Sequence, residues 1–311
     1  MYPRIVCLGG GTGLPNLLRG LKLYSDNITA IVTVADDGGS SGVIRNELKI
    51  PPPGDIRNCL LALANTEPFM EKLFQYRFTN GSLKGHSFGN LFIAAMTEML
   101  GNFELAIKES SKVLAVRGTV LPSTLEDVIL EATYEDGEKA YGESHIPICG
   151  KRISRVTIKP SNAKPLRESL EAIEKADAII LGPGSLYTSL IPNLLVKDLT
   201  EAVCKSNARK IYVTNVMTQP GETDGYTASD HVKAVIKHSS HDVIEYVVVN
   251  TEQIPEDLRI RYLSDGSTPV ECDTQVIKQM GYKVIAKPVI NPTDVVRHSS
   301  EKLAETIMSL I

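Results

Sequence analysis

The sequence predicts a Rossmann-like α/β fold, in which helices cover both faces of a doubly wound, mostly parallel sheet. A glycine-rich turn joins a short apolar strand to a helix near the start of the chain. Short apolar runs then recur along the sequence, as expected for strands that are buried on both faces. Segments with helical spacing separate these runs, and this alternation is typical of parallel sheets.

The first unit of the chain reads as strand, glycine turn, helix and strand. Residues 4–8 form a short apolar run, and Gly9–Gly13 follow it directly. The helix is indicated by leucines at positions i, i+3, i+4 and i+7, which share one face: Leu14, Leu17, Leu18 and Leu21. Residues 28–34 then supply a second strand that is rich in β-branched side chains.

The same pattern continues to the end of the chain. Further strands are expected at residues 178–181, 211–213 and 247–249. Helices are expected at residues 56–64, 88–100, 166–175 and 232–237, with a last helix that reaches residue 311. In the helix at residues 88–100, we expect the Met and Phe positions to lie in the core.

One stretch departs from the alternation of strands and helices. Residues 128–135 and 139–143 flank Asp136-Gly137, a two-residue hairpin signal of the type I′ turn, whose two central residues both need positive φ. With residues 153–158, they predict a small antiparallel subdomain at about residues 117–160, inserted into a single domain of residues 1–311. An edge decoration without chemistry is the simplest interpretation of this insertion.

Composition excludes several classes of protein. The 311 residues carry a formal net charge of −4, which gives no electrostatic footprint for nucleic acid. No apolar run approaches the length of a membrane-spanning helix, and from the first residues we expect no signal peptide. The five cysteines have no C-x-x-C spacing, which indicates reduced thiols in a cytoplasmic protein rather than a zinc site or disulfide frame.

Two glycine loops are candidate phosphate sites. Each follows a predicted strand, so backbone N–H groups and a helix N-terminus can meet an anion at close range. We expect both loops to converge on one pyrophosphate, although glycine used only for a tight turn remains an alternative for the first loop. That loop is neither a full G-x-G-x-x-G nor a P-loop. The candidate residues are Gly10, Gly11, Thr12, Gly13, Gly184, Ser185 and Thr188.

Two carboxylates end the second strand. Asp36 and Asp37 stand about where a dinucleotide-binding fold places its ribose-binding acid. Asp37 can also hold a hydrated magnesium ion beside phosphates. We expect one of the two to face a ligand and the other to be structural, without deciding which. Ser40 and Ser41, which follow in the same loop, are further candidate contacts.

Six more polar positions at strand or helix ends are candidate ligand contacts. Asp55 fits the N-cap of the helix that Pro51–Pro53 precede. Arg297 can clamp a phosphate bidentately, with an exposed surface role as the alternative. His86 is equally well explained as a surface or capping residue. The six residues are Asp55, Asn58, His86, Asn90, Asn215 and Arg297.

At this point the sequence resembles a known family, the YvcK-like gluconeogenesis factor branch of the CofD-like (2-phospho-lactate transferase) superfamily. The stretches that carry the resemblance cover most of the chain: GGGTGLPNLLRGL, TVADDGGSSG, PPPGDIRNCLLALA, HSFGNL, GPGSLYTSLIPNLL and TNVMTQPGET. The resemblance implies a Rossmann-like core with its ligand site at these loops. It also implies a cytoplasmic protein needed for cell shape and for growth on gluconeogenic carbon sources.

Members that the chain resembles bind a UDP-sugar, typically UDP-N-acetylglucosamine, and act on carbon flow into cell-wall precursors. A regulatory factor that binds a nucleotide sugar is therefore our first hypothesis, with a homo-oligomer and an amino-sugar-synthesis enzyme as expected partners. The alternative is a magnesium-dependent phosphoryl or nucleotidyl-type transferase, in which positioning and charge neutralisation supply most of the catalysis. A dehydrogenase with an NAD-like dinucleotide is the third hypothesis, and the imperfect glycine fingerprint disfavours it.

Overall fold

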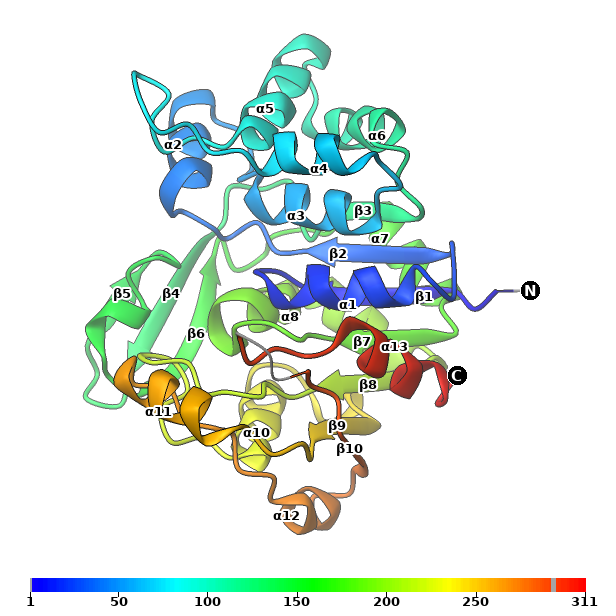
Figure 1. The fold of residues 1–311 in the computed structure, drawn as a ribbon, viewed down its shortest axis with the longest axis vertical. Helices are drawn as coiled ribbons and strands as arrows, with labels where there is room; N and C mark the ends of the chain where they lie inside the picture. Colours follow the sequence, from blue (N-terminus) through cyan, green and yellow to red (C-terminus); the bar gives the residue numbers. More distant parts are fainter. Residues whose placement is uncertain (1, 292–294) are drawn as a thin grey trace.

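The computed structural model of the protein describes residues 2–291 and 295–311. These residues form a seven-stranded parallel sheet with helices on both faces and a separate three-stranded antiparallel sheet (Figure 1). The predicted fold class is thereby confirmed. None of the helices in the described part of the chain is long and apolar enough to cross a membrane.

The main sheet reverses its winding direction between β1 and β7. Its strand order is β10-β9-β8-β7-β1-β2-β3, and all neighbours pair in parallel. The chain therefore builds outward from β1 in one direction and later from β7 in the other. The strands are β1 (Ile5–Gly9), β2 (Ile28–Val32), β3 (Thr119–Pro122), β7 (Ala178–Leu181), β8 (Arg209–Val213), β9 (Tyr246–Asn250) and β10 (Lys283–Lys287).

Both faces of this sheet are buried, which explains the continuous apolar runs. Along β1, Ile5 and Cys7 pack into the core layer of one face, and Val6 and Leu8 pack into the layer of the other. A strand between two cores must be apolar at every position. All five cysteines are free thiols.

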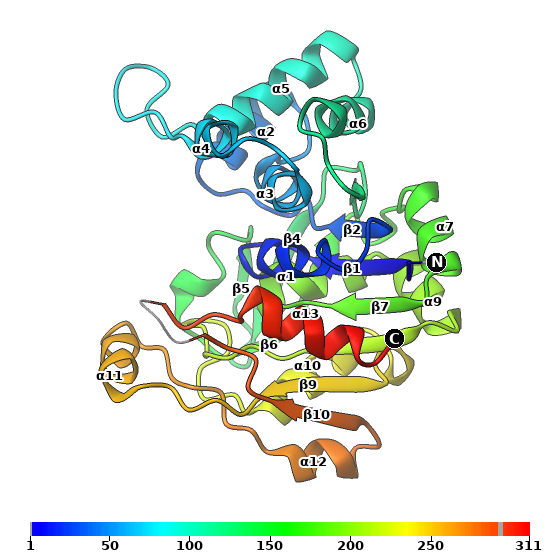
Figure 2. The same ribbon diagram turned by 45° about the vertical axis from the view of Figure 1, so that its right-hand side comes forward.

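The first face of the sheet is covered by helices from the two ends of the chain. The C-terminal α13 packs on α1, and Ser300 of α13 lies so close to Gly20 of α1 that a Cβ on the glycine would meet its carbonyl oxygen at 1.9 Å. Figure 2 shows these two helices side by side. The helices contributing to this core are α1 (Gly13–Leu21), α3 (Gly54–Leu63), α4 (Pro68–Gln75), α5 (Phe88–Leu100), α6 (Phe103–Val113) and α13 (Ser300–Met308).

The second face is covered by helices from the later half of the chain. Their buried residues join one large core cluster with the strands and with the antiparallel sheet. These helices are α7 (Arg167–Lys175), α8 (Ile191–Leu195), α9 (Lys197–Lys205), α10 (Ala228–His238) and α12 (Thr274–Gln279). The remaining α-helices of the described residues are α2 (Gly39–Leu48) and α11 (Glu256–Ser264).

The predicted insertion forms the antiparallel sheet, with two differences from expectation. The sheet has the order β5-β4-β6, with β4 (Ile129–Tyr134), β5 (Lys139–Tyr141) and β6 (Ile153–Lys159), whereas β3 belongs to the main sheet. The type I′ turn is wrong, because only Gly137 has positive φ. Tyr134 N–H donates to the Glu138 carbonyl across a three-residue loop, so a single left-handed glycine closes the hairpin.

The expectation that the Met and Phe positions of α5 lie in the core is also wrong in part. Ile93 and Ala94 are buried, whereas Phe88, Phe92 and Met96 are partly exposed and Met99 is 79% exposed. The helix is apolar on its outer face as well as on its inner one, and helical spacing alone cannot tell the two faces apart.

Candidate functional site

The two glycine loops lie against each other at the carboxyl edge of the sheet. They follow β1 and β7, the neighbouring strands between which the winding reverses, where ligands of open α/β sheets bind. A Cβ on Gly13 would stand 2.6 Å from the Pro183 carbonyl oxygen, and one on Gly184 would stand 3.1 Å from the Gly10 carbonyl oxygen. Glycine at both positions therefore allows the backbones to touch.

A pocket of about 400 Å³ opens beside these loops. The first amides of α1 face no intrahelical acceptor, and no side chain caps this helix. Six predicted contacts line the pocket: Thr12, Gly13, Gly184, Ser185, Asn215 and Arg297. Residues that sequence reasoning missed line it too, among them Asn16, Gln219, Tyr262 and His298.

Positive charge in this pocket comes from Arg297 rather than from its histidine neighbour. Arg297 is exposed, and the pocket lining includes its side chain. Burial lowers the pKa of His298 to about 4, so its ring is neutral at pH 7. The His298 carbonyl accepts a hydrogen bond of 2.5 Å from the Asn16 amide, which ties this segment to α1. The pocket thus combines one guanidinium, the carboxylate of Asp265, neutral polar groups and the amides at the start of α1, and the guanidinium and amides are donors suited to phosphate oxygens.

Gly11 and Asp55 are hydrogen-bonded to each other, and neither residue lines the pocket. The Gly11 N–H donates to Asp55 Oδ2 at 2.6 Å, so this amide is not free for a phosphate. The N-cap expectation for Asp55 is wrong, because α3 starts at Gly54 with Pro53 as its N-cap. Gly10 lies beside this hydrogen bond, and a Cβ on Gly10 would stand 2.6 Å from the same carboxylate oxygen. Burial raises the pKa of Asp55 to about 6.

Thr188 also has an internal partner. It is buried, and its hydroxyl donates to Glu222 Oε1 at 3.0 Å, while the Tyr187 N–H donates to Glu222 Oε2 at 3.2 Å. Burial raises the pKa of Glu222 to about 7. Glu222 therefore holds the start of the helical turn that follows the second glycine loop, a role without a local sequence signal.

The carboxylates after β2 meet a residue of the insertion. Asp36 Oδ1 accepts from the Gly38 N–H at 2.9 Å, and Asp37 Oδ1 accepts from the Ser144 N–H at 2.8 Å. Glu143, which sequence reasoning missed, has a buried oxygen without a hydrogen-bond partner. Burial first, and then Asp55 and the two neighbouring aspartates, raise the pKa of Glu143. The insertion is thus joined to the site instead of standing apart from it.

Asp37 is therefore occupied in holding the insertion, whereas Asp36 has one oxygen, Oδ2, beside the start of α3. Within residues 2–291 and 295–311, no three His, Cys, Asp or Glu side chains are placed to hold a metal ion. A magnesium ion needs only one or two carboxylates when phosphates and water complete its shell. The magnesium site at Asp37 stays a prediction, and Asp36 is the better placed of the two acids.

The remaining predicted residues form a second cluster around the first turns of α2, α3 and α5. Ser40 Oγ lies 3.2 Å from His86 Nδ1 and accepts from Asn90 Nδ2 at 3.2 Å. Asn90 Nδ2 also reaches Ser41 Oγ at 3.4 Å. Arg57 links the cluster, donating to Asn90 Oδ1 at 3.0 Å and to Asn58 Oδ1 at 2.7 Å. These residues do not line the pocket.

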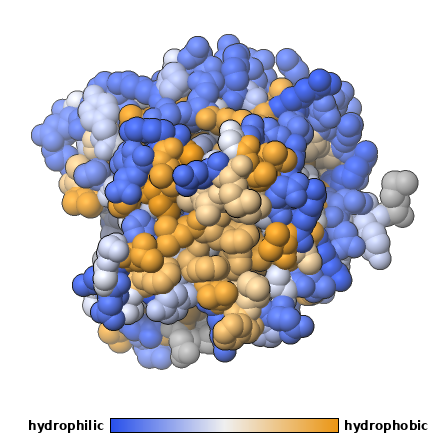
Figure 3. Space-filling view, turned by 90° about the horizontal axis from the view of Figure 1, so that it is seen from above, coloured by the Kyte–Doolittle hydropathy of each residue, from blue (hydrophilic) through white to orange (hydrophobic). Residues whose placement is uncertain are grey.

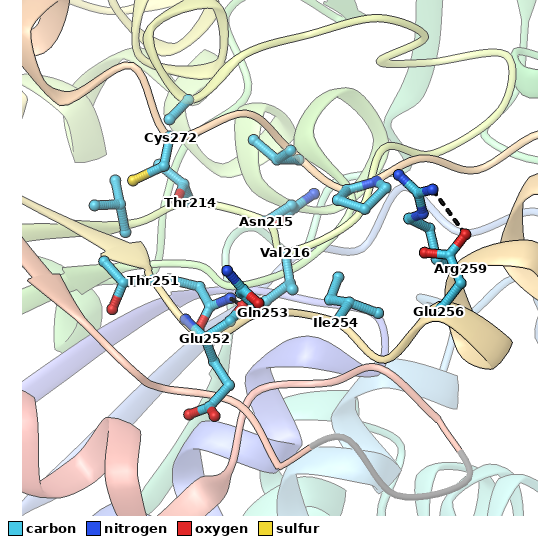
Figure 4. Close-up of a pocket in the computed structure, with 15 residues that line it drawn as sticks. Thr214, Asn215, Val216, Thr251, Glu252, Gln253, Ile254, Glu256, Arg259 and Cys272 are labelled. Carbon is cyan, nitrogen blue, oxygen red and sulfur yellow. Dashed lines mark hydrogen bonds and ion pairs between the residues drawn. The ribbon is translucent and has the colours of Figure 1, made fainter.

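A neighbouring pocket of about 350 Å³ extends the site along the sheet edge. It lies at the ends of β8 and β9 and shares Asn215 and Val216 with the first pocket. Figure 4 shows these two residues near its centre and the Glu256–Arg259 ion pair at one side. The two pockets are therefore neighbours that meet at Asn215 and Val216.

The fold and the site define a doubly wound α/β protein with a pocket at its switch point. The family model described as 2-phospho-L-lactate transferase CofD matches residues 5–290, and the chain belongs to this family. It is 55% identical to the "Putative gluconeogenesis factor" of Thermoanaerobacterium thermosulfurigenes, with 99% of this chain and 97% of the relative covered.

Two further comparisons agree with this assignment. The "Gluconeogenesis factor" of Bacillus subtilis is 53% identical over 99% of this chain and 98% of that protein. A crystal structure of a UPF0052 family member from Bacillus halodurans superimposes with a TM-score of 0.96 at 52% identity, covering 98% of this chain and 99% of that one. The resemblance to the gluconeogenesis factor branch is thereby confirmed.

Proposed function

We propose that this protein is a regulatory factor that binds a nucleotide diphosphate sugar of the UDP-N-acetylglucosamine type. The observation that carries the proposal is the pocket at the switch point, where Gly13, Gly184 and Ser185 meet Arg297. A diphosphate fits the free amides and the guanidinium, and Asn215 leads toward the neighbouring pocket, where a ribose, base or sugar has room.

The relatives named gluconeogenesis factor extend the proposal to the cell. We propose that the ligand reports the supply of cell-wall precursors and that the bound protein acts on an enzyme of amino-sugar synthesis. Loss of the protein then impairs growth on gluconeogenic carbon sources and alters cell shape. A strain in which a variant unable to bind the ligand replaces the wild-type protein is expected to show the same growth defect and the same altered cell shape.

Calorimetric titration with UDP-N-acetylglucosamine tests the binding proposal. We expect saturable heat with the wild type and at least about a tenfold weaker affinity for Arg297→Ala, because a charge-assisted pair to phosphate is lost. Arg167→Ala is the matched control, since Arg167 is exposed on α7 and pairs with Glu171 on the same helix. Absence of heat with the wild type, or equal affinity of Arg297→Ala and the control, contradicts the proposal. Titration with NAD tests the dinucleotide alternative.

The second candidate is a magnesium-dependent phosphoryl or nucleotidyl-type transferase, which the family match favours. Asp36 Oδ2 and Asp37 are the carboxylates that would hold magnesium beside the diphosphate, where the ion would neutralise developing charge. Asp36→Asn tests this candidate better than a change at Asp37, which anchors Ser144. Turnover of a nucleotide substrate that Asp36→Asn abolishes, with an unchanged melting temperature, would favour the transferase.

A further inference from the structure

One side chain of the pocket at the switch point is held by a buried carboxylate. Gln219 lines this pocket and is half-buried, and its Nε2 donates to Glu222 Oε1 at 2.6 Å. Glu222 is only 2% exposed, and it also accepts from the Thr188 hydroxyl at 3.0 Å and from the Tyr187 N–H at 3.2 Å. Glu222 therefore connects the Gln219 side chain to the turn that follows the second glycine loop.

The contact with Glu222 determines which end of the Gln219 amide is left for a ligand. An ionised carboxylate only accepts hydrogen bonds, so the NH2 end of the amide must face it. The backbone of Gln219 is fixed as well, because its N–H donates to the Thr223 hydroxyl at 2.8 Å and its carbonyl accepts from the Thr223 N–H at 2.9 Å. Within the described residues, no group donates a hydrogen bond to the Gln219 amide oxygen. This oxygen is therefore an acceptor at the wall of the pocket.

A second acceptor lines the pocket from the neighbouring segment. The Thr218 N–H donates to the Thr268 carbonyl at 2.7 Å, which brings the segment that carries Asp265 beside Gln219. Both Gln219 and Asp265 line the pocket. Their free oxygens accept hydrogen bonds, whereas the Arg297 guanidinium only donates them. The pocket therefore offers donors for a diphosphate and, separately, acceptors for O–H or N–H groups of the rest of the ligand.

We propose that Gln219 is a specificity-determining residue, whose amide oxygen accepts a hydrogen bond from an O–H or N–H group of the ligand, and that Glu222 is the positioning residue that orients this amide. The inference rests on the proposed binding of a nucleotide diphosphate sugar. Both the hexose and the nucleoside of such a ligand carry donors of this kind. A site built to pair with a donor discriminates strongly against a ligand that lacks it, because the acceptor is then left unpaired.

Calorimetric titration of Gln219→Met with UDP-N-acetylglucosamine tests the acceptor. Methionine keeps the length of the side chain but has no amide, so we expect an affinity at least about fivefold weaker than that of the wild type. Gln75→Met is the matched control, because Gln75 also donates to a glutamate, Glu71 Oε1 at 3.2 Å, but is exposed on α4 and outside the pocket. Figure 3 shows apolar residues gathered across the middle of this side of the protein, where one more methionine suits its surroundings.

The same titrations with UDP locate the donor on the ligand. If Gln219→Met weakens the binding of UDP-N-acetylglucosamine alone, the donor lies on the hexose. If it weakens the binding of both ligands by the same factor, the donor lies on the nucleoside. Either result supports the proposal.

The pH dependence of the affinity separates positioning by Glu222 from a merely structural role. Burial raises the pKa of Glu222 to about 7. Because the ionised form orients Gln219, the affinity should be highest above pH 7 and should fall at least about threefold between pH 8 and pH 6. Glu222→Gln carries no charge, so its affinity should change less over this range. The charged groups that face Glu222 are Glu143 and Arg152 of the insertion and Asp224 of its own loop, and all three are present in both proteins.

Equal affinities of Gln219→Met and the Gln75→Met control overturn the role of Gln219. A wild-type pH profile that Glu222→Gln leaves unaltered overturns the positioning role of Glu222. In both cases, weaker binding by Arg297→Ala would still support the proposed function, whereas a wild type that binds no UDP-N-acetylglucosamine rejects both. A cooperative melting transition shows that each variant is folded, and Gln219→Met decides alone if Glu222→Gln has none.

Discussion

Replacement of Asp55 by Asn is expected to stabilise the protein at neutral pH while reducing the pH dependence of its stability. Asp55 accepts the Gly11 N–H at 2.6 Å, and burial raises its pKa from 3.8 to about 6. The folded protein therefore holds the proton more tightly than the unfolded chain. The contribution of Asp55 to stability is greatest below pH 3.8 and is lost as pH rises to about 6.

The size of the effect follows from the two pKa values. At about 1.4 kcal/mol for each pKa unit, the ionised carboxylate costs about 3 kcal/mol at pH 7.5 and about 1 kcal/mol at pH 4.5. An Asn side chain can still accept the Gly11 N–H but carries no charge. The unfolding free energy of Asp55→Asn minus that of the wild type should thus rise by about 2 kcal/mol between the two pH values.

Urea unfolding followed by circular dichroism at pH 4.5 and pH 7.5 measures this difference. Asp177→Asn is the matched control, because Arg4 lowers the pKa of Asp177 to about 2 and that residue stays ionised at both pH values. Its half-exposed pair contributes less than about 1 kcal/mol, and the loss should be equal at the two pH values. A difference for Asp55→Asn that does not change with pH, or that falls as pH rises, would refute the reasoning.

Three further substitutions test the packing of the site and of the ends of the chain. Gly13→Ala should lower the free energy of unfolding in urea by about 1–3 kcal/mol and weaken nucleotide-sugar binding in calorimetry, because its Cβ would stand 2.6 Å from the Pro183 carbonyl oxygen. An unchanged unfolding free energy and affinity would show that the two loops can separate freely. Thr188→Val should cost about 1–3 kcal/mol by removing a hydrogen bond to buried Glu222, and equal thermal stability would mean that water replaces it. Gly20→Ala should displace α13 and expose it to limited proteolysis, and a wild-type digestion pattern would argue against that contact.

The fold was predictable from the sequence because each of its signals is local. The strands β1, β7 and β9 are buried on both faces and so are apolar at nearly every position, and β8 is so from Ile211 to Val213. Edge strand β10 was missed because its first and last residues, Lys283 and Lys287, are charged and exposed. Strand β3 was assigned to the insertion because four residues carry no information on which sheet they join.

The sequence predicted the site residues only where they lie in a loop that directly follows a strand. The pocket lined by Gly13, Gly184 and Asn215 was expected, because carboxyl ends of parallel strands share one edge of the sheet. Ser40 and His86 were placed in the same site, yet they lie in a cluster built from helix starts. Nothing in the spacing of residues along the chain distinguishes a pocket from a neighbouring polar cluster.

The partners of the glycine loops could not be predicted, because they come from distant segments. Gly11 was expected to offer its amide to a phosphate, but Asp55, 44 residues away, takes it. Glu222 holds the turn after the second loop from 34 residues away. Since carboxylates already hold the shape of both loops, a diphosphate need not organise them on binding. The amides at the start of α1 and the Arg297 guanidinium are then the groups whose interactions the proposed ligand would change. The Arg297 variant therefore tests the proposed function, and the Asp55 variant tests the scaffold.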